Sequence, residues 1–478
     1  MLFNSWQFAI FLPIVFSLYW ITPNKYRWIV ILSSSYFFYG CWNVKYLSLI
    51  ILVTFVSYLG GIGIEKAVDE KHKKLIIWAV CIVSFGLLFV FKYFNFAIES
   101  INSLLRLCGR EGTNIVSNLL LPVGISFYTF QSIGYVIDVY REEIRAERHF
   151  GIFASFVALF PQLVAGPIER TSNLLPQIKA SHTFNYDKST YGLKLMAWGL
   201  FKKVVIADTL GAYVDTTYEN LHTFAGFAKV LAIFFFSVQI YCDFSGYSDI
   251  ARGVAKLFDI DLMENFKSPY FSASIKEFWR RWHISLSTWF RDYVYIPLGG
   301  SRCSTLKTIR NVMITFLTSG LWHGAAWTFV VWGGGHGALQ AVETGISKNK
   351  VLSKISIPRW IKVVVTFILV SLLWTVFRAE SVKDAAYICL LNYRDFDNIA
   401  SWLSRGISNL GMGIKEVVRV VCMLMMLAMY DFASLKNDVI SRISRINKVA
   451  RWAVYFGIVI LIFFWAPSES AEFIYFDF

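Results

Sequence analysis

The sequence predicts an all-α integral membrane protein. Hydrophobic residues make up 56% of the 478-residue chain and charged residues only 16%, well below the roughly 25% of soluble domains. Several apolar stretches reach or approach the about 20 residues that a helix needs to cross a bilayer. We therefore expect about ten to twelve transmembrane helices, some of them broken or re-entrant. Since no linker separates domains, residues 1–478 are predicted to form one integral domain.

The expected spans follow one another along the chain. They cover residues 8–21, 28–42, 47–64, 75–91, 119–139, 228–241, 360–377, 417–429 and 453–465. Two further apolar regions, 150–210 and 312–342, are interrupted by Gly and Pro. No basic residue precedes the first stretch and no small-residue cleavage site follows it, so we expect an anchor and not a cleaved signal peptide.

Basic residues gather in alternate loops, which predicts the orientation of the chain. By the positive-inside rule these loops are cytoplasmic, which places both termini outside the cytoplasm. The loops and anionic lipid headgroups account for most of the formal net charge of +14, so no nucleic-acid partner is indicated. The loop residues are Lys25 and Arg27; Lys66, Lys71, Lys73 and Lys74; Arg141, Arg145 and Arg148; and Lys436, Arg442, Arg445, Lys448 and Arg451.

The cysteines and histidines lack the spacings typical of metal sites. The seven cysteines are odd in number and scattered, so they predict neither a disulfide framework nor a zinc site. The patterns HxxH and HExxH are absent, and we expect no metal. The chain also lacks an internal repeat or a matched pair of broken segments, which many transporters contain.

A basic, weakly hydrophobic segment lies at residues 267–310. It holds eight basic residues and two acidic ones, which favours a cytoplasmic position. Apolar residues at intervals of three and four predict an amphipathic helix at or in the membrane surface. An interfacial helix with a tryptophan belt is one complete interpretation of this segment. The residues in the pattern are Ile275, Trp279, Trp282, Leu286, Trp289 and Tyr293.

Position along the chain separates the seven histidines into two groups. Four lie in polar loops and are expected to be solvated: His72, His149, His182 and His222. His283 follows Trp282 on the predicted amphipathic helix, and His323 and His336 lie in apolar sequence. An ionisable group inside a membrane indicates a functional site, because burying it is unfavourable. The alternative for His323 is a neutral core histidine bonded to a carbonyl.

The residue types allow two kinds of catalytic chemistry. The segment YCDFSGYSD (241–249) offers Ser, Asp and Tyr, but it lacks the GxSxG pattern of a serine hydrolase; on pattern alone it indicates a capped helix end. A neutral buried histidine instead suits a general base that takes a proton from a hydroxyl attacking an acyl group. Gly320 and Gly324 would let a substrate or a neighbouring backbone approach the His323 ring.

Five segments together resemble the membrane-bound O-acyltransferase family, in particular its bacterial branch for alginate O-acetylation. The core motif region is residues 119–343, and the order of the segments is specific. They are LPVGISFYTFQSIGYVIDVYR (121–141), FPQLVAGPIER (160–170), QIYCDFSGYSDIARG (239–253), FWRRWHISLSTWFRDYVYIPLGG (278–300) and TSGLWHGAAWTFVVWGGGHG (318–337).

The resemblance implies a fold with re-entrant and amphipathic helices around a central funnel, and acyl transfer from a cytoplasmic thioester to a hydroxyl. The essential histidine of the family corresponds to His323, and its second histidine to His283, which would position thioester or acceptor. We expect tunnel or substrate contacts from Trp322, Asp243, Ser245, Tyr247 and Asp249.

In this branch the donor is usually acetyl-CoA, with no bound cofactor. Arg280, Arg281 and Arg291 are candidates to attract the CoA phosphates; if they do not, they are membrane-surface anchors. The acetyl group is handed to an extracytoplasmic partner with a serine-hydrolase-like (SGNH) fold, which acetylates a polysaccharide. The expected location is the bacterial inner (plasma) membrane.

The extracytoplasmic tail, residues 468–478, ends in EFIYFDF, which resembles a C-terminal motif of this branch. The resemblance implies that Tyr475 relays the acyl group, although Asp477 stands where the motif has Gln. The alternative is an aromatic interface anchor.

The sequence thus predicts a membrane O-acetyltransferase that modifies an exported or cell-surface polysaccharide, with His323 as the general base. One alternative is D-alanyl transfer to teichoic acids from a carrier-protein thioester. The other, outside this enzyme class, is a polysaccharide or small-molecule transporter.

Overall fold

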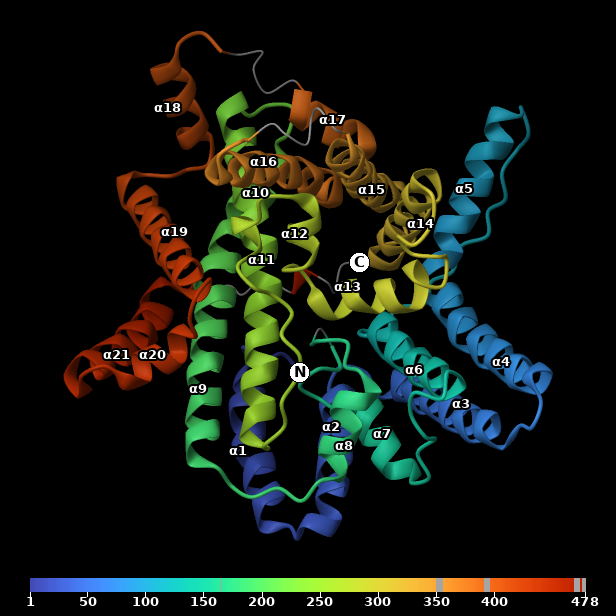
Figure 1. Ribbon diagram of the computed structural model, residues 1–478. Helices are drawn as coiled ribbons and strands as arrows, with labels where there is room; N and C mark the ends of the chain where they lie inside the picture. Colours follow the sequence, from blue (N-terminus) through green and yellow to red (C-terminus); the bar gives the residue numbers. More distant parts are fainter. Residues whose placement is uncertain (165, 350–355, 391–395, 468–472, 475–478) are drawn as a thin grey trace. The chain divides into compact units, whose positions relative to one another are not determined.

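The computed structural model describes residues 1–478 except 165, 350–355, 391–395, 468–472 and 475–478 (Figure 1). Every regular element among the described residues is a helix, as the sequence predicted. The chain forms two compact units. Unit 1 comprises residues 1–193 and 250–263, and unit 2 comprises residues 194–249 and 264–478.

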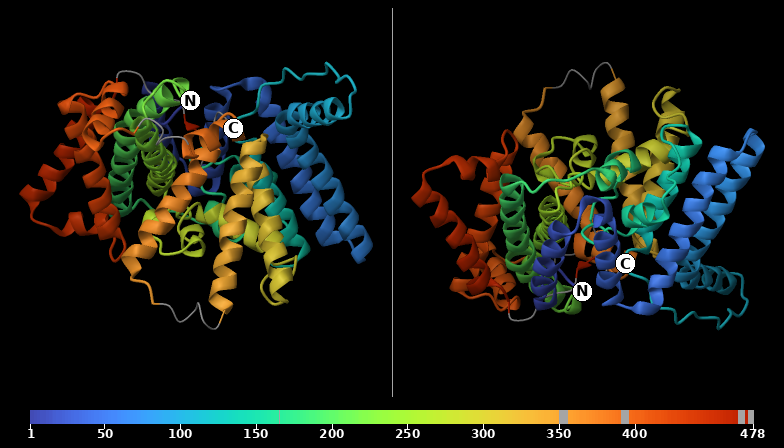
Figure 2. Two further views of the ribbon diagram at one scale, coloured as in Figure 1. Left: turned by 90° about the horizontal axis from the view of Figure 1, so that it is seen from above. Right: turned by 90° about the horizontal axis from the view of Figure 1, so that it is seen from below.

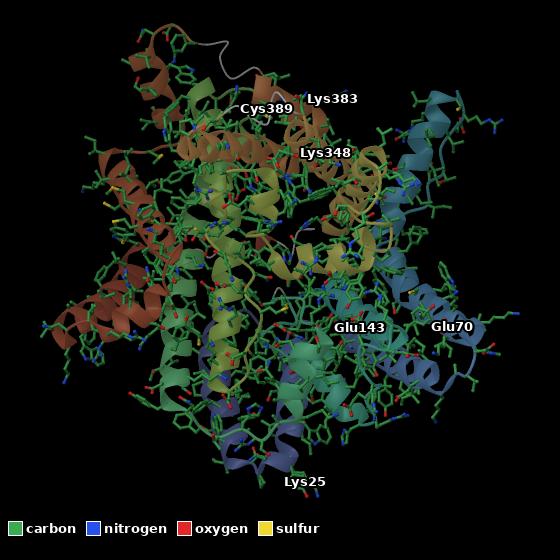
Figure 3. All side chains as sticks on the ribbon, viewed as in Figure 1. Lys25, Glu70, Glu143, Lys348, Lys383 and Cys389 are labelled. Atoms are coloured by element: carbon green, nitrogen blue, oxygen red, sulfur yellow. The ribbon has the colours of Figure 1, made fainter. Side chains whose placement is uncertain are left out.

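Unit 1 begins with a pair of antiparallel helices, α1 (Trp6–Ile21) and α2 (Arg27–Gly40). Ser5 starts α1, because its hydroxyl accepts a hydrogen bond from the Phe8 amide at 3.2 Å and so satisfies an N–H that lacks a partner within the helix. The turn between the two helices carries Lys25, at the edge of the molecule in Figure 3. Both helices correspond to predicted spans.

Small residues bring three further helices of unit 1 together: α3 (Leu47–Lys66), α4 (Glu70–Leu88) and α6 (Ile125–Tyr140). Helices α3 and α4 lie side by side (Figure 2). A Cβ at Gly60 would lie 2.5 Å from Val80, and one at Gly61 would lie 2.5 Å from the Tyr135 hydroxyl. Only glycine therefore permits this spacing, as is common where membrane helices approach closely.

Helix α6 begins later than the sequence predicted. The expected span started at residue 119, but residues 119–124 are not helical. Gly124 has φ 75°, and a Cβ there would lie 2.5 Å from the Leu163 carbonyl oxygen. This left-handed residue fixes the start of the helix at Ile125.

Three more helices lie entirely within unit 1. They are α5 (Phe94–Leu107), α7 (Phe150–Ala158) and α8 (Thr171–Lys179). The loop between α7 and α8 holds the predicted segment 160–170, in which Glu169 is buried. Burial raises the pKa of Glu169 to about 7.

His182 corrects a prediction. The sequence placed it in a polar loop as a solvated side chain, but only 8% of it is exposed. Its Nδ1 lies 2.9 Å from Asp259, and its Nε2 lies 2.6 Å from the Gln177 carbonyl oxygen. Asp259 is distant along the chain, and Gln177 lies on the preceding helix α8. The polar residues next to His182 in the sequence therefore did not reveal its burial.

Two helices contribute to both units: α9 (Tyr186–Leu200) and α11 (Gly226–Leu257). In unit 2, α9 continues into a π-helical segment, η4 (Phe201–Ala207), and then into α10 (Asp208–Glu219). The segment 241–249 lies within the 32-residue α11. Its interpretation as a capped helix end was therefore wrong; its Ser and Asp side chains project from a continuous helix.

The predicted amphipathic helix at residues 275–293 is not continuous. It consists of α12 (Ile275–Trp279), α13 (Ile284–Phe290) and the π-helical η6 (Arg291–Tyr295). Trp282 and Leu286 are buried, so they belong to the protein core and not to a membrane-surface belt. The helix breaks at His283, whose backbone has φ 42°.

Helices α14 (Thr305–His323) and α15 (Trp327–Lys348) pack along each other (Figure 1). Glycines permit the contact: a Cβ at Gly320 would lie 2.2 Å from the Phe329 carbonyl oxygen. The Phe329 backbone thus approaches Gly320 closely; the approach of a substrate or a backbone to the His323 ring stays a prediction. The other helices of unit 2 are α16 (Arg359–Arg378), α17 (Val382–Leu390), α18 (Ile399–Asn409), α19 (Ile414–Ser434), α20 (Val439–Arg445) and α21 (Lys448–Trp465).

Among the described residues, six helices are long and apolar enough to cross a membrane. The total of ten to twelve spans and the single-domain organisation stay predictions. The six candidate spans are Val44–Lys66, Glu70–Leu107, Gly226–Leu257, Arg359–Arg378, Ile414–Ser434 and Lys448–Trp465, and the shorter Trp6–Ile21 is also apolar.

Candidate active site

His323 is the last residue of α14 and lies among aromatic side chains of unit 2. Only 2% of the residue is exposed. Its ring centroid lies 5.0 Å from that of Trp322, 5.0 Å from that of Trp332 and 5.6 Å from that of Phe377. The imidazole is therefore surrounded by aromatic rings on several sides.

His283 occupies the break between α12 and α13 and is fully buried. Its left-handed backbone is unusual for a residue other than glycine, and such conformations cluster at functional sites. Asn265 holds the turn: its carbonyl oxygen accepts from the Ile284 amide at 3.0 Å, and its Oδ1 accepts from the Ser285 amide at 3.2 Å. Burial lowers the pKa of His283 to about 3, so the ring is neutral near pH 7.

The two histidines that the family resemblance selected lie together. The ring centroids of His283 and His323 are 6.5 Å apart, although His283 precedes α13 and His323 ends α14. Trp322 lies beside both, at 6.1 Å from His283 and 5.0 Å from His323. A pair of buried imidazoles can move a proton to or from a hydroxyl held between them.

His336 has a different environment, although it is also fully buried. Its Nδ1 accepts a hydrogen bond from the Trp279 indole N–H at 3.3 Å. The ring stacks nearly parallel to Phe278 and also lies beside Trp332. These contacts give His336 a packing role.

Two lysines on η4 contact the segment 241–249. Lys202 donates to Ser245 Oγ at 2.9 Å and pairs with Asp249 at 2.8 Å. Lys203 pairs with Asp243 at 2.7 Å and with Asp208 at 2.8 Å. Three of the residues predicted to line a tunnel therefore belong to buried or partly buried polar networks, and their contact with substrate stays a prediction.

The sequence reasoning missed both lysines. Lys202 and Lys203 are buried, and they lie in the apolar run LFKKVVIAD (200–208). Two adjacent cations in such a run were the available signal, because charges in membrane segments are rare and usually paired. The π-helical geometry of η4 is a second signal, visible only in the structure, since such segments are frequent at functional sites.

Two described residues of the C-terminal tail, Phe473 and Ile474, reach the same part of unit 2. Phe473 and Ile474 are buried, and the Ile474 amide donates to Asp243 Oδ2 at 2.8 Å. The Phe473 ring centroid lies 4.8 Å from that of Tyr247 and 6.0 Å from that of Phe244. Tyr475, the predicted acyl carrier, lies outside the described residues.

Two of the three arginines predicted to attract CoA phosphates are engaged with neighbouring carboxylates. Arg281 pairs with Glu277 at 2.9 Å, and Arg291 pairs with Asp292 at 2.7 Å. Arg280 is exposed. Any phosphate would compete with these pairs at Arg281 and Arg291, whereas Arg280 presents its charge to solvent.

The part of the chain that the structure describes contains no group of three or more His, Cys, Asp or Glu side chains arranged to hold a metal ion. All seven cysteines are free thiols.

Comparison with known proteins identifies the family. The model of MBOAT, the membrane-bound O-acyltransferase family, matches residues 141–380. The chain belongs to the membrane-bound O-acyltransferase family. That match contains η4, the whole segment 241–249 and all three buried histidines of unit 2. The acyltransferase prediction is confirmed, and the transporter alternative is dropped.

Curated relatives of this acyltransferase cover most of the chain. The probable alginate O-acetylase AlgI of Azotobacter vinelandii is 40% identical over 405 residues, which is 83% of this chain and 79% of the relative. The peptidoglycan O-acetyltransferase of Helicobacter pylori is 35% identical over 419 residues, 80% of this chain and 78% of the relative. The teichoic acid D-alanyltransferase of Bacillus subtilis is 28% identical over 264 residues, which is 52% of this chain and 67% of the relative.

Proposed function

We propose that this acyltransferase moves an acetyl group from cytoplasmic acetyl-CoA across the membrane for O-acetylation of an exported or cell-surface polysaccharide. The names of the alginate and peptidoglycan relatives support a polysaccharide acceptor. Their identity exceeds that of the D-alanyltransferase relative and extends over more of this chain. The observation that carries the chemistry is the buried pair of His283 and His323, whose rings are 6.5 Å apart.

In the proposed reaction a neutral ring nitrogen of His323 accepts the proton of the acceptor hydroxyl, while the hydroxyl oxygen attacks the carbonyl carbon of the acetyl thioester. The carbon–sulfur bond breaks, the acetyl group stays on the acceptor oxygen, and His323 returns the proton to the leaving CoA sulfur. His283 supports this step as a neutral polar group that orients thioester or acceptor. The reaction needs no bound cofactor.

The acetyl group then leaves the membrane through a carrier and a partner. In this proposal Tyr475 is the first acceptor, and an extracytoplasmic partner with a serine-hydrolase-like (SGNH) fold takes the acetyl group from it to the polymer. The enzyme is placed in the bacterial inner membrane with both termini outside. The seating of Phe473 beside Tyr247 supports the approach of the tail to the active site.

Arg280, Arg281 and Arg291 are proposed to attract the CoA phosphates at the cytoplasmic side. The two carboxylate pairs make Arg280 the arginine whose charge is most available. Arg280→Gln should therefore raise the apparent KM for acetyl-CoA more than Arg291→Gln does. A KM unchanged from the wild type in both variants, and in the variant that neutralises all three arginines, would assign the arginines to the membrane surface.

The test of the proposed function uses two donors. Purified enzyme in nanodiscs is incubated with radiolabelled acetyl-CoA or with a D-alanyl carrier-protein thioester, and released CoA, released carrier and protein-bound label are measured. Release of CoA and label on the wild type, absent in His323→Ala, supports the proposal. Turnover of the carrier thioester alone would establish the D-alanyl alternative. In the same assay Tyr475→Phe should lose bound label, because it lacks the nucleophilic oxygen.

A further inference from the structure

We propose that Asp243 is a latch that seats the C-terminal tail beside the histidine pair, through the backbone amide of Ile474. Asp243 Oδ2 accepts this amide at 2.8 Å, and both residues are buried. The two partners are far apart in sequence, so the bond anchors a distant segment to α11. The seat itself does not depend on the chemistry above, whereas its effect on acyl transfer rests on the proposed function.

The charges around Asp243 explain why the latch takes an N–H group. Lys203 lies between two carboxylates, with its Nζ 2.7 Å from Asp243 Oδ1 and 2.8 Å from Asp208 Oδ1. Formally, one positive charge faces two negative charges. A buried carboxylate needs further hydrogen bonds to satisfy its oxygens, and Lys203 contacts the other oxygen of Asp243. The tail amide supplies a donor at Oδ2.

Aromatic contacts connect this seat to the histidine pair. Phe473, which is 2% exposed, contacts Tyr247, one helix turn after Asp243, and Phe244, the residue next to Asp243. The Phe244 ring in turn meets His283 edge to face, with centroids 4.6 Å apart. The seat therefore recognises an aromatic side chain together with the amide of the next residue. The Phe244 ring contacts both Phe473 and His283.

A neighbouring ion pair provides a matched control. Lys202 pairs with Asp249 on the same two elements, η4 and α11, at 2.8 Å. Its additional bond goes to Ser245 of α11 and not to the tail. Loss of the Asp249 carboxylate removes a comparable ion pair but leaves the Ile474 amide on Asp243.

The latch is tested by the rate at which a glutamate-specific protease cuts the tail of the full-length protein. Its sites in the tail, Glu469 and Glu472, lie four residues and one residue before Phe473. Tail cleavage, measured by intact mass, should accelerate at least about fivefold in Asp243→Ala. It should accelerate equally in Ile474→Pro, because proline has no amide hydrogen. Ile474→Val and Asp249→Ala should stay within about twofold of the wild type, as neither removes the bond.

Melting temperatures identify variants that are not folded. If Asp243→Ala fails to fold, Ile474→Pro carries the test, because it leaves the ion pairs of the core intact. Wild-type cleavage rates in folded Asp243→Ala or folded Ile474→Pro would overturn the latch. Because the assay involves no donor, an enzyme inactive with acetyl-CoA could still show the latch. An active enzyme whose tail is cleaved equally in all variants would lose only the latch.

Discussion

His323 and His336 have nearly the same burial but different partners. Their exposed fractions are 2% and 0%, and both rings lie 5.0 Å from Trp332. His336 accepts the Trp279 indole N–H, whereas His323 lies beside a second buried histidine. Burial in apolar sequence therefore does not by itself mark a catalytic histidine. The second polar ring at His323 is what distinguishes the site.

The largest expected effect separates the two histidines by activity. His323→Ala should lower acetyl transfer by about a hundredfold or more, because general-base catalysis typically contributes 10²–10⁴-fold. The melting temperature of the variant should stay close to that of the wild type. Initial rates of CoA release, normalised to folded protein, measure the effect. Retention of full activity would place the base elsewhere.

Substitution of His336 is expected to affect stability. His336→Ala leaves a cavity and removes the acceptor of the Trp279 N–H, which together should cost about 2–4 kcal/mol of folding free energy. The folded fraction should transfer acetyl at a rate close to that of the wild type. Denaturant unfolding and rates per folded molecule measure the two quantities. A variant with normal stability and no activity would give His336 a catalytic role and remove the contrast.

The turn that Asn265 holds at His283 offers a third test. Asn265→Ala removes the acceptor of the Ser285 amide at the start of α13 and should cost about 0.5–2 kcal/mol, as for a lost helix cap. The looser turn should reduce kcat more than it changes KM. Asn265→Asp keeps an acceptor oxygen and should restore most of kcat. Equal kcat in all three proteins would show that this turn does not position His283.

The pH dependence of stability gives the smallest effect. The pKa of His283 is lowered by burial to about 3, whereas an unfolded histidine titrates near 6.5. Between these values the unfolded chain binds a proton that the folded chain does not, so stability falls as the pH drops below about 6.5. The wild type should lose up to about 1.4 kcal/mol per pH unit more than His283→Gln. Parallel stability curves between pH 7 and about pH 5 would contradict a neutral buried His283.

The sequence predicted those features that depend on local pattern. The helical class and most apolar spans followed from hydropathy, and the role of His323 as the base stays a prediction. The pairing of His283 with His323 came from the family resemblance, because the two lie on separate segments. The close contact at Gly320 is made by the Phe329 backbone, whereas the sequence predicted an approach to the His323 ring, which stays a prediction.

Features that depend on distant contacts were missed. His182 was assigned to solvent because its partner Asp259 is distant in sequence. The predicted helix at 275–293 is broken at His283, where Asn265 holds a left-handed turn. Periodicity could not reveal this break, because Asn265 lies outside the predicted helix. Lys202 and Lys203 were overlooked although their apolar context was visible. Their carboxylate partners are identified only when η4 packs against α11.

A double-mutant cycle tests most directly whether His283 and His323 form one acyl-transfer site. CoA release from acetyl-CoA is measured for the wild type, His283→Gln, His323→Ala and the double variant, each normalised to folded protein. If the two rings act as a unit, the double variant should be no slower than His323→Ala, because effects within one catalytic unit are not additive. Multiplication of the two separate losses would contradict the account and assign the histidines to independent roles.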